Sequence, residues 1–168
     1  MSVPPAAAAR ADRRPLSEAA RQEIRQLAAR YEHRQSALLP ALFVAQAEYG
    51  WLPPEALEGV AQTLDLPLAE VVSVASFYHL FYLAPVGRHV VQVCTNVSCM
   101  LAGCGAVVAR LRERLGVGPG STTPDGRFTW RTAECLAACD EAPVVLVDED
   151  RWPRVQPEAV DDLLARYP

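Results

Sequence analysis

The sequence predicts an α+β protein in which an N-terminal helical bundle precedes an α/β domain. Apolar residues recur every three or four positions up to about residue 86, which is the period of an amphipathic helix. Beyond the segment Pro85-Val86-Gly87 the pattern changes to short runs rich in valine, which are typical of strands. With 168 residues and 51% hydrophobic content, the chain can bury one good core or two small ones. We therefore expect a flexible tail over residues 1–15, a helical domain over 16–86 and an α/β domain over 87–168.

Capping residues and prolines divide the first half into predicted helices. Ser17 can cap the first helix, Gly50 is placed to end the second, and Pro67 suits the first turn of the fourth. The expected ranges are Ser17 to Tyr31, Leu38 to Tyr49, Pro53 to Leu64 and Pro67 to Phe81. Their apolar spacing suits a small bundle.

The second half alternates strand and helix signals. The expected strands are His89 to Val93, Phe128 to Arg131, Val144 to Val147 and Trp152 to Val155, and the expected helices are Ala106 to Leu115 and Pro157 to Arg166. The order β-α-β-β-α resembles a thioredoxin-like α/β domain. Loops at the ends of the strands carry the cysteines.

Four of the five cysteines form two close pairs, Cys94-x4-Cys99 and Cys135-x3-Cys139, with 35 residues between the pairs. Iron–sulfur clusters are held by four thiolates, and two short pairs that a fold brings together supply them at a small loop-closure cost. The pattern therefore indicates a metal site, and it favours a [2Fe–2S] cluster bound by Cys94, Cys99, Cys135 and Cys139.

Other uses of these cysteines fit less well. Structural zinc favours C-x2-C knuckles, and a thioredoxin-type redox pair needs C-x-x-C, which is absent. An odd cysteine count and the lack of a secretory signal disfavour a disulfide framework. A Rieske centre needs histidine ligands within the pairs, and His33, His79 and His89 lie elsewhere. Structural zinc stays open as the main alternative.

Residues around the pairs suit a cluster. Small residues allow backbone amides to approach sulfur, and we expect this of Ala102, Gly103, Gly105, Ala137 and Ala138. Met100, Leu101 and Leu136 are candidates for an apolar cover or for ordinary core positions. Cys104 is interpreted as a small residue that does not bind iron, because four ligands are already present.

Several longer runs resemble one known family. The runs VQVCTNVSCMLAG, TTPDGRF, ECLAACDEAP, ASFYHLF and EYGWLP are similar to those of the 24 kDa subunit of respiratory complex I, the E subunit of bacterial NADH-quinone oxidoreductase. The resemblance extends from about Leu38 to Tyr167. It implies a [2Fe–2S] cluster on a thioredoxin-like domain behind a helical domain, with Cys94, Cys99, Cys135 and Cys139 as ligands.

The same resemblance implies partners. Family members bind beside the F-type flavoprotein subunit, which holds FMN and oxidises NADH, and beside other subunits of the peripheral arm. This chain would then transfer single electrons on the cytoplasmic face of the inner membrane without entering the membrane. It departs from the family at Ala137, where Gly is common, and at Asp140, where Gly or a small polar residue is common. Both changes leave the ligands intact but bear on the potential of the cluster.

Other classes of function are disfavoured. A helix-turn-helix regulator needs basic residues against phosphate, yet no Lys or Arg lies between Arg34 and Arg88, and the net charge is −4. A free electron carrier would not need the helical domain. The chain lacks G-x-G-x-x-G and P-loop motifs, so we expect FMN and NADH to be bound by the partner. The equivalent subunit of an NAD-linked formate dehydrogenase or hydrogenase remains the alternative.

Overall fold

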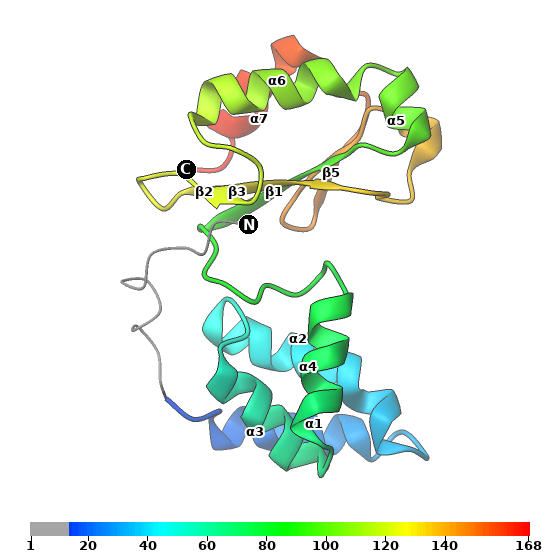
Figure 1. The fold of residues 1–168 in the computed structure, drawn as a ribbon, viewed down its shortest axis with the longest axis vertical. Helices are drawn as coiled ribbons and strands as arrows, with labels where there is room; N and C mark the ends of the chain where they lie inside the picture. Colours follow the sequence, from blue (N-terminus) through cyan, green and yellow to red (C-terminus); the bar gives the residue numbers. More distant parts are fainter. Residues whose placement is uncertain (1–13) are drawn as a thin grey trace. The chain divides into compact units, whose positions relative to one another are not determined.

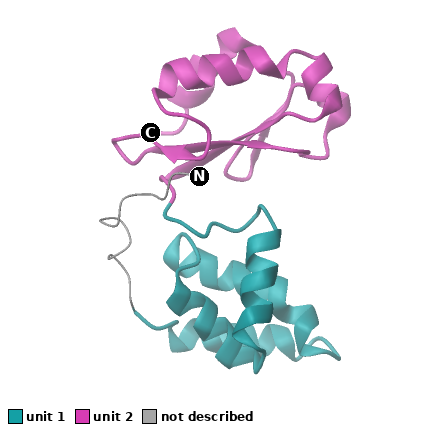
Figure 2. Ribbon diagram, viewed as in Figure 1, with its two compact units in different colours: residues 1–85 teal, residues 86–168 magenta. Residues whose placement is uncertain are grey.

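The computed structural model describes residues 14–168 and divides the chain into two compact units. Unit 1 ends at Pro85 and unit 2 begins at Val86 (Figure 2), one residue before the boundary expected from the sequence. The predicted tail lies, up to residue 13, outside the described residues. Among residues 14–168, no helix is long and apolar enough to cross a membrane.

Unit 1 consists of helices packed around one core (Figure 1). The helices are α1 (Glu18–Ala28), the 3-10 helix η2 (Arg34–Ala37), α2 (Leu38–Tyr49), α3 (Pro54–Leu64) and α4 (Leu68–Phe77). Ser17 caps α1 as predicted, because its hydroxyl accepts a hydrogen bond from the N–H of Ala20. Gly50 ends α2 with a φ of 77°, a left-handed conformation that glycine adopts without strain. Fully buried apolar side chains from all four α-helices, among them Ile24, Leu42, Val60 and Val71, form the core.

Helix α4 ends four residues earlier than the sequence predicts. Tyr78 has an extended backbone with φ −90° and ψ 122°. The side chain of Gln46 on α2 then holds the following segment, because it donates to the carbonyl of Leu80 (3.1 Å) and accepts from the N–H of Tyr82 (2.8 Å). These tertiary hydrogen bonds replace the last turn of the expected helix.

Unit 2 is a five-stranded sheet in the order β2-β3-β1-β4-β5. The strands are β1 (His89–Cys94), β2 (Ser121–Thr122), β3 (Phe128–Ala133), β4 (Val145–Val147) and β5 (Asp150–Trp152). The helical elements are α5 (Val97–Leu101), α6 (Cys104–Leu115), η3 (Cys139–Glu141), η4 (Pro157–Ala159) and α7 (Val160–Ala165). Strands β1 and β3 are parallel, and the other pairs are antiparallel. Helices α6 and α7 lie on one face of the sheet (Figure 1).

The parallel register decides where the cysteine loops begin. Cys94, the last residue of β1, is paired with Ala133, the last residue of β3. Because the carboxyl ends of parallel strands meet at one edge, the loops after β1 and β3 leave the sheet side by side. The short helix α5, the two-residue strand β2 and the start of β5 at Asp150 differ from the expected elements.

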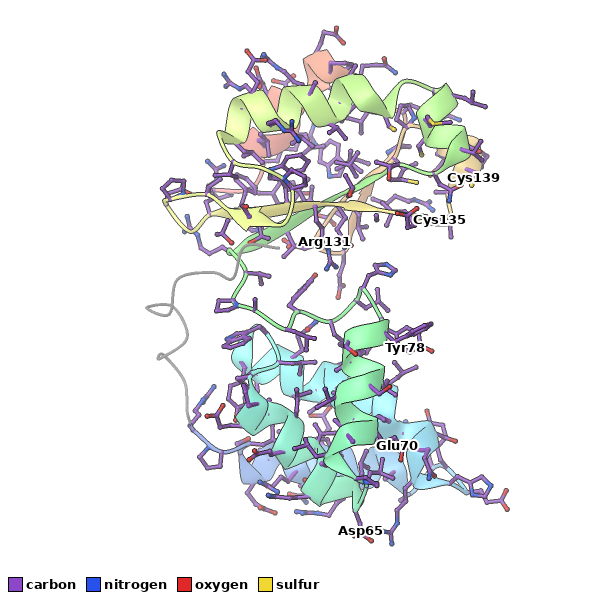
Figure 3. The ribbon with its side chains drawn as sticks, viewed as in Figure 1. Asp65, Glu70, Tyr78, Arg131, Cys135 and Cys139 are labelled. Carbon is purple, nitrogen blue, oxygen red and sulfur yellow. The ribbon has the colours of Figure 1, made fainter. Side chains whose placement is uncertain are left out.

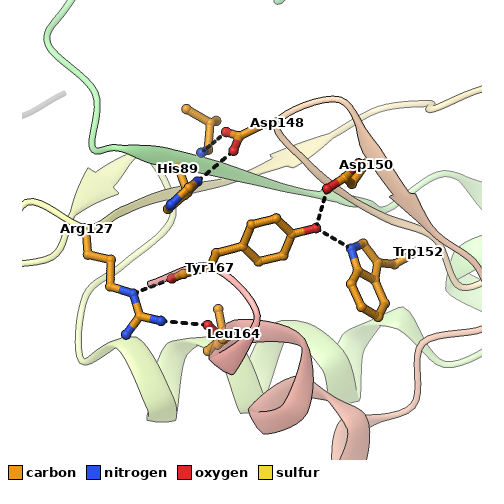
Figure 4. A network of polar contacts seen from close by, with 8 residues as sticks. His89, Arg127, Asp148, Asp150, Trp152, Leu164 and Tyr167 are labelled. Carbon is orange, nitrogen blue, oxygen red and sulfur yellow. Dashed lines mark hydrogen bonds and ion pairs between the residues drawn. The ribbon is translucent and has the colours of Figure 1, made fainter.

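A polar network fixes the C-terminus at the opposite edge (Figure 4). His89 Nδ1 lies 2.7 Å from the carboxylate of Asp148, and Trp152 donates to the hydroxyl of Tyr167 at 2.8 Å. The guanidinium of Arg127 donates to the carbonyl of Tyr167 (2.6 Å). An open surface hollow lined in part by Arg127 also lies at this edge. His89 begins β1 and Cys94 ends it, so both features are remote from the cysteines.

Candidate metal centre

All four predicted ligands lie at the carboxyl ends of β1 and β3 or in the segments that follow these strands. Cys94 ends β1 and Cys99 lies within α5. Cys135 follows β3 by two residues, and Cys139 begins η3. Helix α5 contacts η3, which brings the loop of the first pair against the loop of the second. Figure 3 shows the two cysteines that it labels, Cys135 and Cys139, at this edge.

The two pairs differ in burial. Cys94 and Cys99 are 3% and 1% exposed, whereas Cys135 and Cys139 are exposed. The N–H of Cys94 donates to the carbonyl of Val144 (3.0 Å), so neighbouring strands enclose the end of β1. The first pair is therefore buried, with Cys94 on the sheet and Cys99 in α5, and the second pair lies on a surface loop.

Burial also sets the acidity of the first pair. Burial raises the pKa of the Cys99 thiol from its ordinary 9.0 to about 11, with smaller contributions from a hydrogen bond to Cys94 and from the charges of Cys94 and Cys104. A hydrogen bond from the backbone N–H of Val144 acts in the opposite direction. Without a metal, Cys99 is thus a protonated thiol at neutral pH, and binding a metal has to release that proton.

Backbone amides reach sulfur at two places. The N–H of Ala137 donates to Sγ of Cys135 at 3.3 Å, as expected from the small residues of that loop. The second donor is the N–H of Val144, which follows the second pair in the chain but donates to Cys99 of the first pair. No feature of the sequence pattern indicates this hydrogen bond. The amides of Ala102 and Gly103, two of the residues expected near sulfur, donate instead to the carbonyls of Ser98 and Met100.

Ala137 occupies a left-handed backbone conformation with a φ of 55°. This conformation costs a residue with a side chain roughly 1 kcal/mol or more, and glycine adopts it freely. The N–H of Ala137 donates to Sγ of Cys135 from this conformation, so one residue of the loop combines a hydrogen bond to sulfur with backbone strain.

Other residues near the pairs agree with expectation only in part. Met100 and Leu101 are 60% and 82% exposed, so they do not form an apolar cover within this chain. Leu136 is partly buried and packs against the buried cysteines. Cys104, the first residue of α6, is buried in the same cluster as Cys94 and Cys99. Burial, and then the charge of Cys94, raises the pKa of Cys104.

The four cysteines suit the ligand pattern of a [2Fe–2S] cluster. A tetrahedral zinc site needs all four thiolates at about 2.3 Å from one atom. A [2Fe–2S] cluster instead divides its four thiolates between two irons. Two separate pairs with amide donors directed at sulfur match that division.

Known proteins of one kind are similar to this chain along most of its length. The chain is 47% identical over 147 residues to the E 2 subunit of NADH-quinone oxidoreductase from Rhizobium meliloti (strain 1021), covering 88% of each chain. It is 40% identical over 152 residues to the E subunit of NADH-quinone oxidoreductase from Escherichia coli (strain K12), covering 90% of this chain and 92% of the relative.

Among solved structures, the air-oxidized NAD+-reducing [NiFe]-hydrogenase superposes with a TM-score of 0.65 and 27% sequence identity. The match covers 75% of this chain but only 22% of that hydrogenase chain. Residues 24–168 match the family model described as thioredoxin-like [2Fe-2S] ferredoxin. This match covers most of the chain, including the mixed sheet and both cysteine pairs. The chain therefore belongs to the thioredoxin-like [2Fe–2S] ferredoxin family.

Proposed function

We propose that this chain is an electron-transfer subunit that binds one [2Fe–2S] cluster through Cys94, Cys99, Cys135 and Cys139. The observation that carries the proposal is the meeting of two cysteine loops at the carboxyl ends of parallel β1 and β3, where α5 contacts η3. Cys104 shares the buried cluster but lies outside the two pairs, and we assign it no iron.

When bound, the cluster supplies one-electron chemistry, being reduced and reoxidised at a potential that its surroundings set. The chain's own residues provide those surroundings. The amides of Ala137 and Val144 direct partial positive charge at two of the sulfurs and favour their thiolate form. Cys94 and Cys99 are buried away from water, while the exposed side of Cys135 and Cys139 leaves a route for an electron.

The host complex in this proposal is NADH-quinone oxidoreductase. The support is the similarity to the E subunit of that enzyme over about nine tenths of the chain, 88% and 90% in the two relatives above. A flavoprotein chain of the F type would bind FMN and oxidise NADH, and this chain would accept electrons singly beside it. The complex would lie at the cytoplasmic face of the inner membrane, with this chain peripheral to it.

A second host is favoured by one observation. The superposition on an NAD+-reducing [NiFe]-hydrogenase, at a TM-score of 0.65, supports the same module in an NAD-linked hydrogenase. The two hosts differ in the second substrate, so quinone reduction and hydrogen oxidation by the native complex distinguish them. The genes that flank this one give the same answer at lower cost.

Anaerobic reconstitution of the purified chain tests the cluster. We expect two irons and two sulfides per chain, with an EPR signal of a [2Fe–2S] centre after reduction. Stoichiometric zinc in place of iron in protein isolated from native cells would contradict the proposal. Co-expression with the flavoprotein chain should give a pair that contains FMN and reduces ferricyanide with NADH, whereas this chain alone should do neither.

A further inference from the structure

Helix α4 presents an uncharged surface to solvent. Six of its ten residues are exposed, and none of the six is charged. We call these residues the α4 face: Leu68, Ala69, Val72, Ser73, Ser76 and Phe77. The only charged residue of the helix is Glu70, which is partly buried. Since α4 also buries Val71 and Ala75 in the core, it is apolar on more than one side.

A helix on a protein surface normally carries charged residues on its solvent side. Helix α1 of the same unit follows that rule, because its exposed residues include Glu18, Glu23 and Arg25. In contrast, α4 leaves Leu68 41%, Val72 39% and Phe77 79% exposed. An apolar patch of this kind is typical of a surface that another protein covers. Ala69, Ser73 and Ser76 are small enough to let a partner approach the helix closely.

The chain beyond α4 extends the patch in a fixed conformation. The rings of Phe77 and Tyr78 are in edge contact, with centroids 5.1 Å apart. Leu80 is 40% exposed, and its carbonyl is held by Gln46. These hydrogen bonds tie the aromatic end of the patch to α2, so its side chains are presented on a well-fixed backbone, which lowers the entropic cost of binding.

Charges around the α4 face indicate the kind of partner. Glu58 and Asp65 line one surface hollow together with Leu68, the first residue of α4, and Glu70 lies within α4. Arg34 forms an ion pair with Asp65, and no Lys or Arg lies between Arg34 and Arg88. Figure 3 labels Asp65 and Glu70 near the start of α4 and Tyr78 at its end. A second copy of this chain would place one acidic surface against another, and an anionic lipid surface would also be repelled. A protein with an apolar groove and a basic rim is complementary.

We propose that the α4 face is a docking surface for the flavoprotein chain that oxidises NADH. This inference rests on the proposed function, which supplies the partner, and it adds which residues bind that partner and which chemistry the partner presents. The flavoprotein would cover Val72, Ser73 and Phe77 with apolar side chains and place Arg or Lys near the acidic rim.

A charge substitution in the co-expressed complex tests the proposal. Ser73→Arg adds a long cation in the middle of the α4 face, and Gln22→Arg adds the same charge on the solvated side of α1. Both sites are exposed helix positions, and Arg is at least as good a helix former as the residue replaced, so both variants should fold. The readouts are FMN per chain in the purified complex and the EPR signal of the cluster.

We expect Ser73→Arg to weaken binding of the flavoprotein by about tenfold or more, and Gln22→Arg to leave it unchanged. Phe77→Ser should weaken binding without adding charge, and both α4 variants should keep the cluster signal. If both α4 variants retained FMN as wild type does, the docking surface would be wrong while the proposed function stood.

Two other outcomes also contradict the docking surface. A wild-type chain that holds its cluster but does not copurify with the flavoprotein would contradict the proposed function as well. Self-association of wild type in sedimentation experiments that Ser73→Arg abolishes would identify a second copy as the occupant.

Discussion

The two cysteine pairs lie at one edge of one sheet, yet they are held in different ways. Cys94 ends β1, the central strand, and β3 and β4 flank it on both sides. Cys135 leaves β3, whose other neighbour is the two-residue strand β2, so that loop is exposed. The first pair, Cys94 at the end of the central strand and Cys99 in α5, is therefore buried, whereas the second pair is exposed. In the proposed centre, a cluster would have two buried ligands and two exposed ones.

Removal of a ligand should have the largest effect. Alanine in place of Cys94, Cys99, Cys135 or Cys139 deletes one thiolate, and we expect iron content and the EPR signal to fall to near zero in each variant. Cys104→Ala is the matched control and should keep two irons per chain. If Cys135→Ala kept its full iron content and Cys104→Ala lost its iron, the three buried cysteines, Cys94, Cys99 and Cys104, would all be ligands and Cys135 would not.

The second-largest expected effect is a difference between the two cysteine pairs in their rates of thiol labelling in the cluster-free chain. With iodoacetamide near pH 8, we expect Cys135 and Cys139 to react about tenfold or more faster than Cys99, as measured by peptide mass spectrometry. The thiolate is the reactive form, and burial raises the pKa of Cys99 to about 11, so its labelling should accelerate as the pH rises toward that value. Equal rates at all positions near pH 8 would mean that the first pair is not enclosed.

A glycine at position 137, in the loop of the second pair, should increase the stability of the fold. Ala137→Gly removes the strain of a left-handed alanine at φ 55°, and we expect the free energy of unfolding to rise by up to about 1 kcal/mol. Ala138→Gly is the control, because a negative φ of −132° leaves no left-handed strain to relieve, and loss of its buried methyl group should destabilise by roughly 0.5–1 kcal/mol. Urea unfolding of the cluster-free variants measures both changes. If Ala137→Gly destabilised as much as the control, the left-handed conformation would be in doubt.

The smallest expected effect is a shift in the midpoint potential of the cluster on replacement of Asp140. Asp140 is exposed, lies next to Cys139 and makes no ion pair among the interactions of the described residues. Asp140→Gly removes a negative charge that opposes the added electron, so the midpoint potential should rise by a shift on the order of tens of millivolts. Glu149→Gly removes the same charge from the turn between β4 and β5, at the opposite edge, and should change the potential less. An equal shift in both variants would indicate a net-charge effect.

Much of the fold could be predicted from periodicity and capping residues. Helix α2 has the predicted bounds, Leu38–Tyr49, because Gly50 ends it by a local rule. The end of α4 could not be predicted, since it depends on hydrogen bonds from Gln46 across the bundle. Helix α5 and strand β2 are short elements whose sequences lack a clear period.

The candidate site likewise has features that the sequence predicts and features that it does not. Residue type and spacing are sufficient to select the four cysteines as candidate ligands, because iron–sulfur chemistry demands thiolates. The burial of each cysteine cannot be predicted from residue type and spacing, since it depends on which strand becomes the central one. The amide of Val144 at Cys99 escapes prediction for a related reason: the contact crosses from one loop to the other. Met100 and Leu101 are candidates for a cover because they are apolar, but their exposure depends on the orientation of α5.

The pairing of Cys94 with Ala133 has a consequence for how this chain can vary in length. The 35 residues between the cysteine pairs do not set the distance between the loops in space, because the strand register does. The turn around Gly118, between α6 and β2, can therefore gain or lose residues at a cost that grows only slowly with loop length. Two residues inserted beside Cys135, in contrast, would move a sulfur. Homologues are then best recognised by the short gaps within each pair, with the long gap between the pairs left free.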